Sequence, residues 1–283
     1  MLRRKFIEAA FFKALMILSA GVIFFAVGSI LYTIVSRGWE SLTWSMITEL
    51  PGGEFYVGRE GGLLNAIIGS LMIVGGSTIL GLLVSIPVVF YLNVYLKPTS
   101  KFGSFVRLSS DVLFGVPSIV YGAFGYAIMV ALGLKTSLLG GIMVITLLII
   151  PIFIRSMDEV ARTMPRDILS AAFSLGATKL QTIRVVLRQI MPGIATATLL
   201  SIGRAIGDAA AVLFTAGYTD SIPTTLSQPV ATLPLAVFFQ LSNPIPEVQD
   251  RAYSAALILT IIVLVLSITG RLITNSFSRN RIK

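Results

Sequence analysis

Six apolar runs divide the chain, and each is close to the length that a membrane-spanning helix needs. A helix of about 20 residues crosses the hydrocarbon core of a bilayer. The runs cover residues 16–35, 63–96, 112–134, 138–154, 194–216 and 253–272. The fourth is short and the second is long for one straight crossing, so we expect Pro87 to kink the second helix or part of this run to leave the hydrocarbon. The pattern predicts an all-α integral membrane protein with six transmembrane helices.

The composition agrees with this pattern and removes several classes of protein. Hydrophobic residues make up 55% of the chain and charged residues only 12%, and the mean hydropathy is +0.89, which is too apolar for a soluble domain. The sequence has no cysteine and no histidine, so it lacks thiolate chemistry and the usual metal ligands and general base. We therefore expect no cofactor and no metal site.

Six spans place alternate connections on opposite sides of the membrane, and the basic residues are concentrated in the connections of one side. They cluster before the first run, after the second, after the fourth and after the sixth, while the other connections hold few of them beside several acidic residues. By the positive-inside rule, both termini are cytoplasmic, and an even number of spans requires the same. The net charge is +9, but the basic residues form no stripe mixed with aromatic residues. We therefore expect the chain to contact membrane lipid and not to bind nucleic acid.

A single transmembrane domain over residues 1–283 is expected in the inner membrane, with a core at 63–272 and an N-terminal span at 14–36. A cleaved signal peptide is the alternative for the first run. That run is longer than the apolar core of about 7 to 15 residues that signal peptides have. The first run is therefore interpreted as a retained helix.

The fifth apolar run carries two charges, Arg204 and Asp208, at a spacing that places them on one face of a continuous helix. A charge at membrane depth costs about 3 kcal/mol, so it normally faces protein or a water-filled path. Either the two form an ion pair that serves folding, or Arg204 binds a passing oxyanion while Asp208 holds the guanidinium in place. Arg155, at the end of the fourth run, is a second candidate on this path, although snorkelling to the interface also explains it.

A break in the third run and two stripes of small residues are also expected to shape the path. Gly115 and Pro117 predict the break, which would expose backbone groups beside Ser118 to the same cavity. Small residues four apart allow helices to pack closely. Such close packing is expected for the walls of a path between two subunits, and equally for a helix bundle without a path. The stripes are Gly203, Gly207, Ala211 and Thr215 in the fifth run and Ser77, Gly81 and Ser85 in the second.

The connection over residues 155–193 is patterned as structure. Pro165 is expected to open a short helix that Gly176 closes with a left-handed cap, and Thr178 with Gln181 predicts a capping box that starts a second, amphipathic helix. The second helix is expected to lie along the membrane or against a neighbour. The first is short enough to enter a groove on a cytoplasmic partner, although a plain connecting loop fits the pattern equally well.

The stretch over residues 170–177 resembles the EAA loop of ABC importer permeases, a Glu-Ala-Ala-x-x-x-Gly pattern. Ala171, Ala172 and Gly176 match it, and Ser170 stands where the family usually has Glu. The resemblance implies that this segment is the coupling helix that docks on an ATPase subunit. Small residues and a terminal glycine suit such close docking.

Two further stretches resemble the A-type permease subunit of the phosphate ABC importer. They are Gly-Val-Pro-Ser-Ile-Val-Tyr-Gly at 115–122 and the fourteen residues at 204–217, where Asp208, Ala209 and Ala211 replace the usual Glu, Thr and Pro. The resemblance implies a type I, MetI-like importer permease for phosphate. It also implies a second, non-identical permease, two ATPase subunits and an extracytoplasmic phosphate-binding protein. This sequence has no Gly-x-x-x-x-Gly-Lys-Ser/Thr loop, so ATP hydrolysis is expected in another subunit.

Three alternatives to phosphate import remain at this point. The same machinery importing molybdate, sulfate or tungstate is the nearest. An ion-coupled secondary transporter would more often show two related halves, and a membrane-embedded enzyme would need a nucleophile or base that the chain lacks.

In residues 217–250, the apolar section 233–241 predicts a re-entrant or surface helix that closes the outer mouth and meets the binding protein, with an interfacial loop as the alternative.

Overall fold

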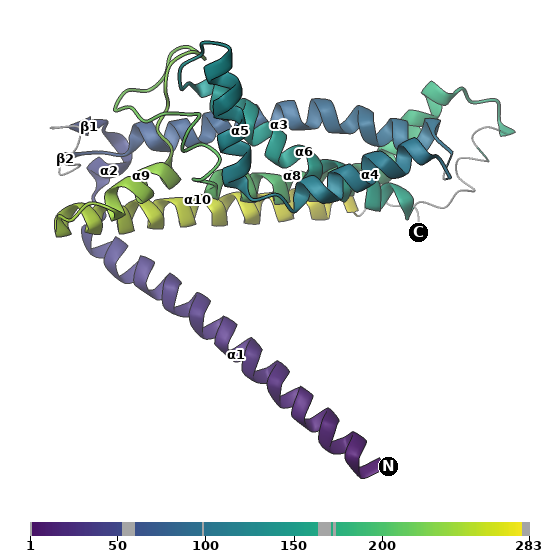
Figure 1. Ribbon diagram of the computed structural model, residues 1–283, viewed down its shortest axis with the longest axis horizontal. Helices are drawn as coiled ribbons and strands as arrows, with labels where there is room; N and C mark the ends of the chain where they lie inside the picture. Colours follow the sequence, from purple (N-terminus) through teal and green to yellow (C-terminus); the bar gives the residue numbers. More distant parts are fainter. Residues whose placement is uncertain (1, 53–59, 98, 164–170, 172–173, 279–283) are drawn as a thin grey trace.

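The computed structural model describes residues 2–52, 60–97, 99–163, 171 and 174–278 (Figure 1). Its long helices are α1 (Leu2–Ser41), α3 (Leu64–Phe90), α6 (Leu138–Arg162), α8 (Lys179–Gly207) and α10 (Pro246–Ser278). The short ones are α2 (Trp44–Thr48), α4 (Lys101–Phe114), α5 (Ser118–Ala131) and α9 (Leu233–Leu241). Strands β1 (Pro51–Gly52) and β2 (Glu60–Gly61) form a two-residue antiparallel pair with Pro51 opposite Gly61.

The helices confirm the predicted all-α membrane architecture and its six spans. Within the described residues, five helices are long and apolar enough to cross a membrane, and the pair α4 and α5, bent by 102°, gives the sixth when it is counted as one span. The third run was predicted to start at residue 112, but its helical part starts at Lys101. Ser100 caps that start, since its hydroxyl accepts a hydrogen bond from the backbone N–H of Gly103 at 3.3 Å.

The second span matches its predicted bounds of 63–96 to within one residue, whereas the fourth and fifth spans differ from the prediction. Pro87 lies inside α3 without ending it, and the span closes in a π-helical turn, η1 (Tyr91–Tyr95). The fourth span continues through Arg155 to Arg162, because backbone hydrogen bonds hold a helix together whether or not its side chains are apolar. The predicted capping box at Thr178 and Gln181 is present, but the helix that it starts is continuous with the fifth span, so the prediction of a separate helix was wrong. Of the two predicted placements, packing against a neighbour is the one observed, since Val186 and Ile190 are buried in the core.

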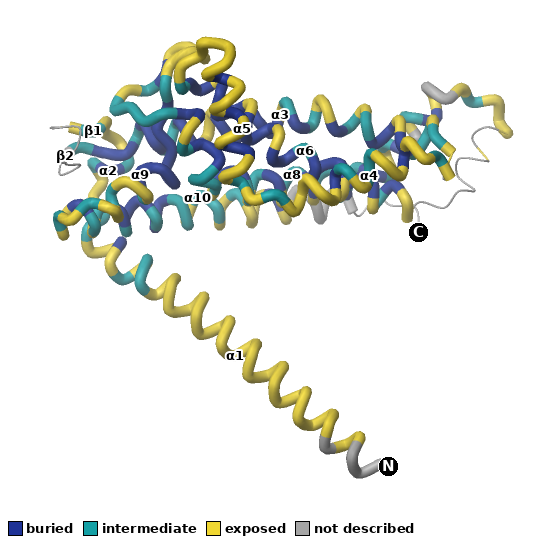
Figure 2. The backbone as a smooth tube through the Cα atoms, in the orientation of Figure 1, coloured by how far each residue is buried: buried dark blue, intermediate teal, exposed yellow. Residues whose placement is uncertain are grey.

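The core lies where α3, α6 and α8 pack against one another (Figure 2). Phe153, Ile145 and Ile149 of α6 are fully buried there. The predicted close packing of the small residues in α3 is confirmed. Ser77, Gly81 and Ser85 are buried, and a Cβ at Gly81 would lie 2.8 Å from Cε2 of Phe153. The glycine is needed because the ring occupies the space of a side chain.

Helix α1 leaves the bundle at an angle, and its apolar side chains are exposed along most of its length (Figures 1 and 2). Its end packs closely on α10: a Cβ at Gly38 would lie 2.6 Å from the carbonyl oxygen of Tyr253, and the Ser254 hydroxyl donates to the Gly38 carbonyl at 2.9 Å. In Figure 1, α1 begins and α10 ends toward the same end of the bundle.

The section predicted at residues 233–241 is helix α9, so the alternative of an irregular loop was wrong for it. Thr232 caps its start, and the backbone N–H of Leu233 donates to the Ser70 hydroxyl of α3 at 2.8 Å. Nine residues span about 14 Å at 1.5 Å each, too little to cross a bilayer.

The ring of Phe239 contacts Tyr218 of the preceding loop. Burial, and then the charge of Asp220, raise the pKa of Tyr218 to about 12. This phenol therefore stays protonated at neutral pH.

Candidate functional site

The third span is broken between α4 and α5, at the residues that predicted a break. Gly115 caps α4, and Pro117, with φ −59° and ψ 139°, directs the chain out of the helical path before α5 begins at Ser118. The hydroxyl of the buried Tyr121 donates to the carbonyl of Leu113 at 2.9 Å and ties the two halves together. The bend leaves the side chain of Phe114 exposed at the corner.

Two arginines from different helices lie over the ring of Phe114. The guanidinium carbon of Arg155, from α6, is 5.2 Å from the ring centroid, and that of Arg204, from α8, is 5.7 Å away. Both distances fall in the range of a cation–π interaction, in which the negative face of the ring attracts the cation. The fold thus brings together the two arginines that sequence analysis selected from separate spans.

The two arginines differ in their acidic neighbours. Arg155 pairs with Asp111 of α4 at 3.6 Å between Nη1 and Oδ1, and both side chains are about half exposed. An exposed pair of this kind contributes at most about 1 kcal/mol, so it separates easily. Among the described residues, Arg204 lies over the ring of Phe114 and forms no ion pair with Asp208.

Asp208 does not share a helical face with Arg204, so the prediction of an intrahelical pair was wrong. Helix α8 ends at Gly207, and Asp208 is its extended C-cap residue. The carboxylate turns to the following segment and accepts a hydrogen bond from the backbone N–H of Ala211 at 2.8 Å. A short acidic side chain competes in this way with the continuation of a helix. Ala211 and Thr215 consequently leave the predicted stripe, and Gly203 and Gly207 face open space.

A polar cleft of about 440 Å³ opens between α4 and α6 on the side of Arg155. Its nine lining residues are mostly charged, and sequence analysis treated several of them only as signals of topology. They are Arg107, Ser110, Asp111, Ile154, Arg155, Asp158, Glu159, Arg162 and Thr163. Arg155 therefore borders a space that is wide enough for a small hydrated anion.

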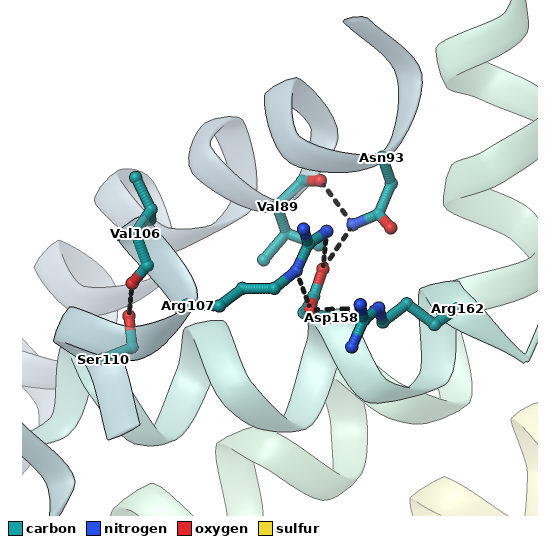
Figure 3. Close-up of polar contacts among 7 residues, drawn as sticks. All are labelled: Val89, Asn93, Val106, Arg107, Ser110, Asp158 and Arg162. Carbon is teal, nitrogen blue, oxygen red and sulfur yellow. Dashed lines mark hydrogen bonds and ion pairs between the residues drawn. The ribbon is translucent and has the colours of Figure 1, made fainter. Parts of the chain in front are cut away.

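Asp158, in this cleft, was missed by sequence analysis although it is the centre of a polar network (Figure 3). Arg107 donates to both carboxylate oxygens, from Nε at 2.8 Å and from Nη2 at 3.1 Å, and Asn93 Nδ2 donates to Oδ1 at 2.8 Å. Arg162 lies farther away, at 3.9 Å. Asp158 and Arg107 are 51 residues apart in sequence, so no local spacing pairs them.

The predicted coupling segment is described in part. Gly176 adopts φ +80°, the left-handed conformation expected of a helix-ending glycine. Ala171 and Leu175 are exposed, with Leu175 at 89%, while Ser170 and Ala172 lie outside the described residues. Gln181 completes the following cap, since its Oε1 accepts from the backbone N–H of Thr178 at 2.8 Å. The segment thus presents an apolar side chain outward beside a sharp helix end.

Comparison with known proteins connects this architecture to transport. Residues 77–283 match the family model described as binding-protein-dependent transport system inner membrane component. The chain is 32% identical to the phosphate transport system permease protein PstA of Haemophilus influenzae, over 86% of this chain and 85% of the relative. It is 34% identical to PstA 2 of Mycobacterium tuberculosis, over 99% and 91%.

Two solved transporters share the fold. The chain is similar to a subunit of the inward-facing MetNI methionine ABC transporter, with a TM-score of 0.63 and 18% identity over 76% of this chain and 95% of that one. It is also similar to a chain of a bacterial alginate ABC transporter solved with a periplasmic protein bound to an alginate pentasaccharide. There the TM-score is 0.64, with 11% identity over 98% and 99%. At these identities the likeness establishes the MetI-like importer fold alone.

Proposed function

Since the chain belongs to the family of binding-protein-dependent transport system inner membrane components, we propose that it is the membrane-spanning permease subunit of an ATP-driven importer of inorganic phosphate. The family establishes a multi-pass membrane permease. The substrate is supported by relatives that carry the name of phosphate transport permeases over more than four fifths of both chains. The arginine pair at Phe114 is the observation on this chain that carries the proposal.

The complex contains a second, non-identical permease, two ATPase subunits and an extracytoplasmic phosphate-binding protein. ATP is hydrolysed in the ATPase subunits, because this sequence lacks a phosphate-binding loop. Gly203 and Gly207 support the second permease, since both lie on α8 with open space in front of them and would let another helix approach closely. The domain over 1–283 is then one half of a two-permease pathway.

The pathway passes the arginine pair. Phosphate is an oxyanion, and the planar fork of a guanidinium donates two parallel hydrogen bonds to such a group. Phe114 holds Arg155 and Arg204 near each other without neutralising them, which a carboxylate would do. Binding must also be weak enough for release, and Asp111 assists release by reclaiming Arg155 when the anion leaves.

Ser118 and Asp208 support the arginine pair from the two ends of the path. Ser118 begins α5, where the first backbone N–H groups of a helix have no partner within it and favour a passing anion. Asp208 holds the turn after α8 through Ala211 and thereby fixes the end of the helix that carries Arg204. Its role in this proposal is to position the backbone, not to pair with Arg204.

The coupling segment transmits the work of ATP hydrolysis. Ala171, Gly176 and the exposed Leu175, which inserts into the ATPase subunit, belong to the docking segment, and Ser170 and Ala172, outside the described residues, are assigned to it by their sequence. Movement there switches access of the arginine pair from one side of the membrane to the other. Both termini are cytoplasmic, and Trp39 and Trp44, exposed by 70% and 77%, anchor the other end of α1 at the outer interface.

Uptake of radiolabelled phosphate tests the proposal. The chain would be expressed with its three partner proteins in cells that lack their own phosphate importers, and unlabelled sulfate, molybdate or tungstate would be added in excess. We expect ATP-dependent accumulation that phosphate suppresses and the other anions leave unchanged. Accumulation of one of the other oxyanions instead, or accumulation that persists without the ATPase subunits, would contradict the proposed function.

A further inference from the structure

Four charged side chains join α4 to α6, and we call them the α4–α6 seam: Arg107 and Asp111 of α4, Arg155 and Asp158 of α6. Asp158 is only 5% exposed and receives two hydrogen bonds from Arg107, at 2.8 and 3.1 Å. Asp111 and Arg155 form the outer pair at 3.6 Å. Figure 3 shows the inner pair, with Arg107 and Asn93 both reaching toward Asp158.

The order of charges permits one register between the two helices. Residues 107 and 111 share a face of α4, and 155, 158 and 162 share a face of α6, because each set follows helical spacing. Since Arg107 faces Asp158 while Asp111 faces Arg155, the helices run antiparallel at the seam.

Sliding α4 by one helical turn in either direction would bring like charges together. In one direction Asp111 would meet Asp158 and Arg107 would meet Arg162; in the other Arg107 would meet Arg155. A buried carboxylate that loses its partner is strongly disfavoured, so the inner pair resists such a slide more than the exposed outer pair does.

The seam lies between the coupling segment and the arginine pair. Helix α6 ends at Arg162, one turn after Asp158, and the chain continues from there to the segment that Gly176 closes. Helix α4 ends at Phe114, two turns after Arg107, with its ring under Arg155 and Arg204. A force applied to the end of α6 therefore reaches Phe114 through the contact of Asp158 with Arg107.

We propose that Asp158 is a positioning residue for transport: by clamping Arg107, it makes α4 and the cytoplasmic end of α6 move as one body, so that movement of the coupling segment carries Phe114 with it. The inference rests on the proposed function and adds to it a link between ATP hydrolysis and the arginine pair. Asp158 contacts no substrate in this proposal. It acts through Arg107 and Phe114.

The number of phosphate ions imported per ATP hydrolysed tests the clamp in the complete complex reconstituted in vesicles with its binding protein. Asp158→Asn keeps the size of the side chain and removes its charge, and we expect the ratio to fall at least tenfold while the complex assembles and hydrolyses ATP. Asp158→Glu restores the carboxylate and is expected to recover much of the ratio. Arg162→Gln, at the weak 3.9 Å contact, is the matched control and should keep the wild-type ratio.

A wild-type ratio in assembled Asp158→Asn complexes would overturn the clamp and leave the proposed function intact. If the wild-type complex hydrolyses ATP with the binding protein present and imports no phosphate, the proposed function fails instead. The two failures are therefore distinguishable in one set of vesicles.

A second measurement uses the wild-type contact and so does not depend on folding of an Asp158 variant. Because the sequence has no cysteine, spin labels can be attached at Ser104→Cys on α4 and Thr163→Cys after α6, both of which are exposed. Electron resonance would follow the label-to-label distance while ATP and loaded binding protein drive the cycle. We expect one unchanged distance distribution, and a shift between ATP-bound and ATP-free complexes would refute movement as one body.

Discussion

At the scale of single residues, the chain concentrates its chemistry at a corner where three helices meet. Phe114 of α4 holds Arg155 of α6 and Arg204 of α8 over one ring, and Asp111 competes for one of the two cations. The ring of Phe114 carries two positive charges, and both attract a dianion that approaches it. This electrostatic reason makes the pair, more than either arginine alone, suited to phosphate.

Replacing Arg204 with Gln is expected to reduce phosphate uptake by roughly 10- to 100-fold, because a hydrogen bond to a charged group contributes about 1.5 to 3 kcal/mol. Arg204→Lys keeps the charge without the fork and should be intermediate. Uptake would be measured in vesicles that contain equal amounts of assembled complex. Loss of assembly with normal uptake per remaining complex would show that Arg204 serves the fold only.

Phe114→Leu keeps an apolar side chain and removes the ring. A cation–π interaction contributes about 0.5 to 1 kcal/mol at an exposed site, so we expect uptake to fall roughly two- to fivefold. Phe114→Tyr, which retains the ring, is the matched control and should transport normally. Equal rates for Leu and Tyr would mean that the ring does not organise the arginines.

At the scale of elements, two features carry the proposed coupling and the proposed access path. One is the break that turns α4 into α5 by 102° and exposes Phe114 at its corner. The other is the coupling segment, whose end at Gly176 has a conformation that few other residues adopt. The seam between α4 and α6 links the first feature to the second.

Gly176→Val is expected to lower ATP-driven uptake several-fold while the protein still inserts. A side chain in the left-handed region costs about 1 to 2 kcal/mol and more when it is β-branched, so the docking helix would end differently. Gly176→Asn is the control, because Asn tolerates this conformation. ATP hydrolysis and uptake would both be measured, and normal uptake with Val would remove Gly176 from the coupling role.

Gly81→Ala tests the packing of α3 on α6. The added methyl would lie 2.8 Å from the ring of the fully buried Phe153, so we expect a loss of about 1 to 3 kcal/mol in stability. Gly75→Ala on the same helix meets nothing within 4 Å and should leave stability unchanged or slightly higher. Thermal unfolding in detergent, followed by circular dichroism, would compare the two variants. Equal midpoints would contradict the packing described for Gly81.

At the scale of the whole molecule, the chain leaves surfaces that nothing within its described residues covers. Apolar side chains of α1 are exposed along most of the helix, and Gly203 and Gly207 of α8 face open space. In the proposed complex, lipid covers the first surface and the second permease packs on the second. The same proposal assigns ATP hydrolysis to the ATPase subunits.

The purified chain alone is therefore expected to accumulate no phosphate in vesicles, with or without ATP inside. Adding the second permease, the ATPase subunits and the binding protein should restore uptake against a gradient. The measurement is the ratio of internal to external labelled phosphate at steady state. Uphill accumulation by the chain alone would show that it is not a subunit of an ATP-driven complex.

The sequence by itself determined the features that depend on local chemistry. Apolar runs of membrane-spanning length predicted six spans, Gly115 and Pro117 predicted the break, and Thr178 with Gln181 predicted a capping box. Each of these follows from hydropathy, from the restricted backbone of proline or from hydrogen bonds between near neighbours. Short-range physics of this kind is visible in a single string of residues.

Only the tertiary structure decided which distant residues meet. Arg155 and Arg204 share the ring of Phe114, and Asp158 binds Arg107 across 51 positions, because packing of α4, α6 and α8 brings these helix faces together. Asp208 shows the reverse. Its spacing placed it beside Arg204, but the helix ends at Gly207 and the carboxylate caps the next turn. Helical spacing predicts neighbours only while the helix continues, and this helix ends within its apolar run, where the Asp208 carboxylate accepts from the backbone N–H of Ala211.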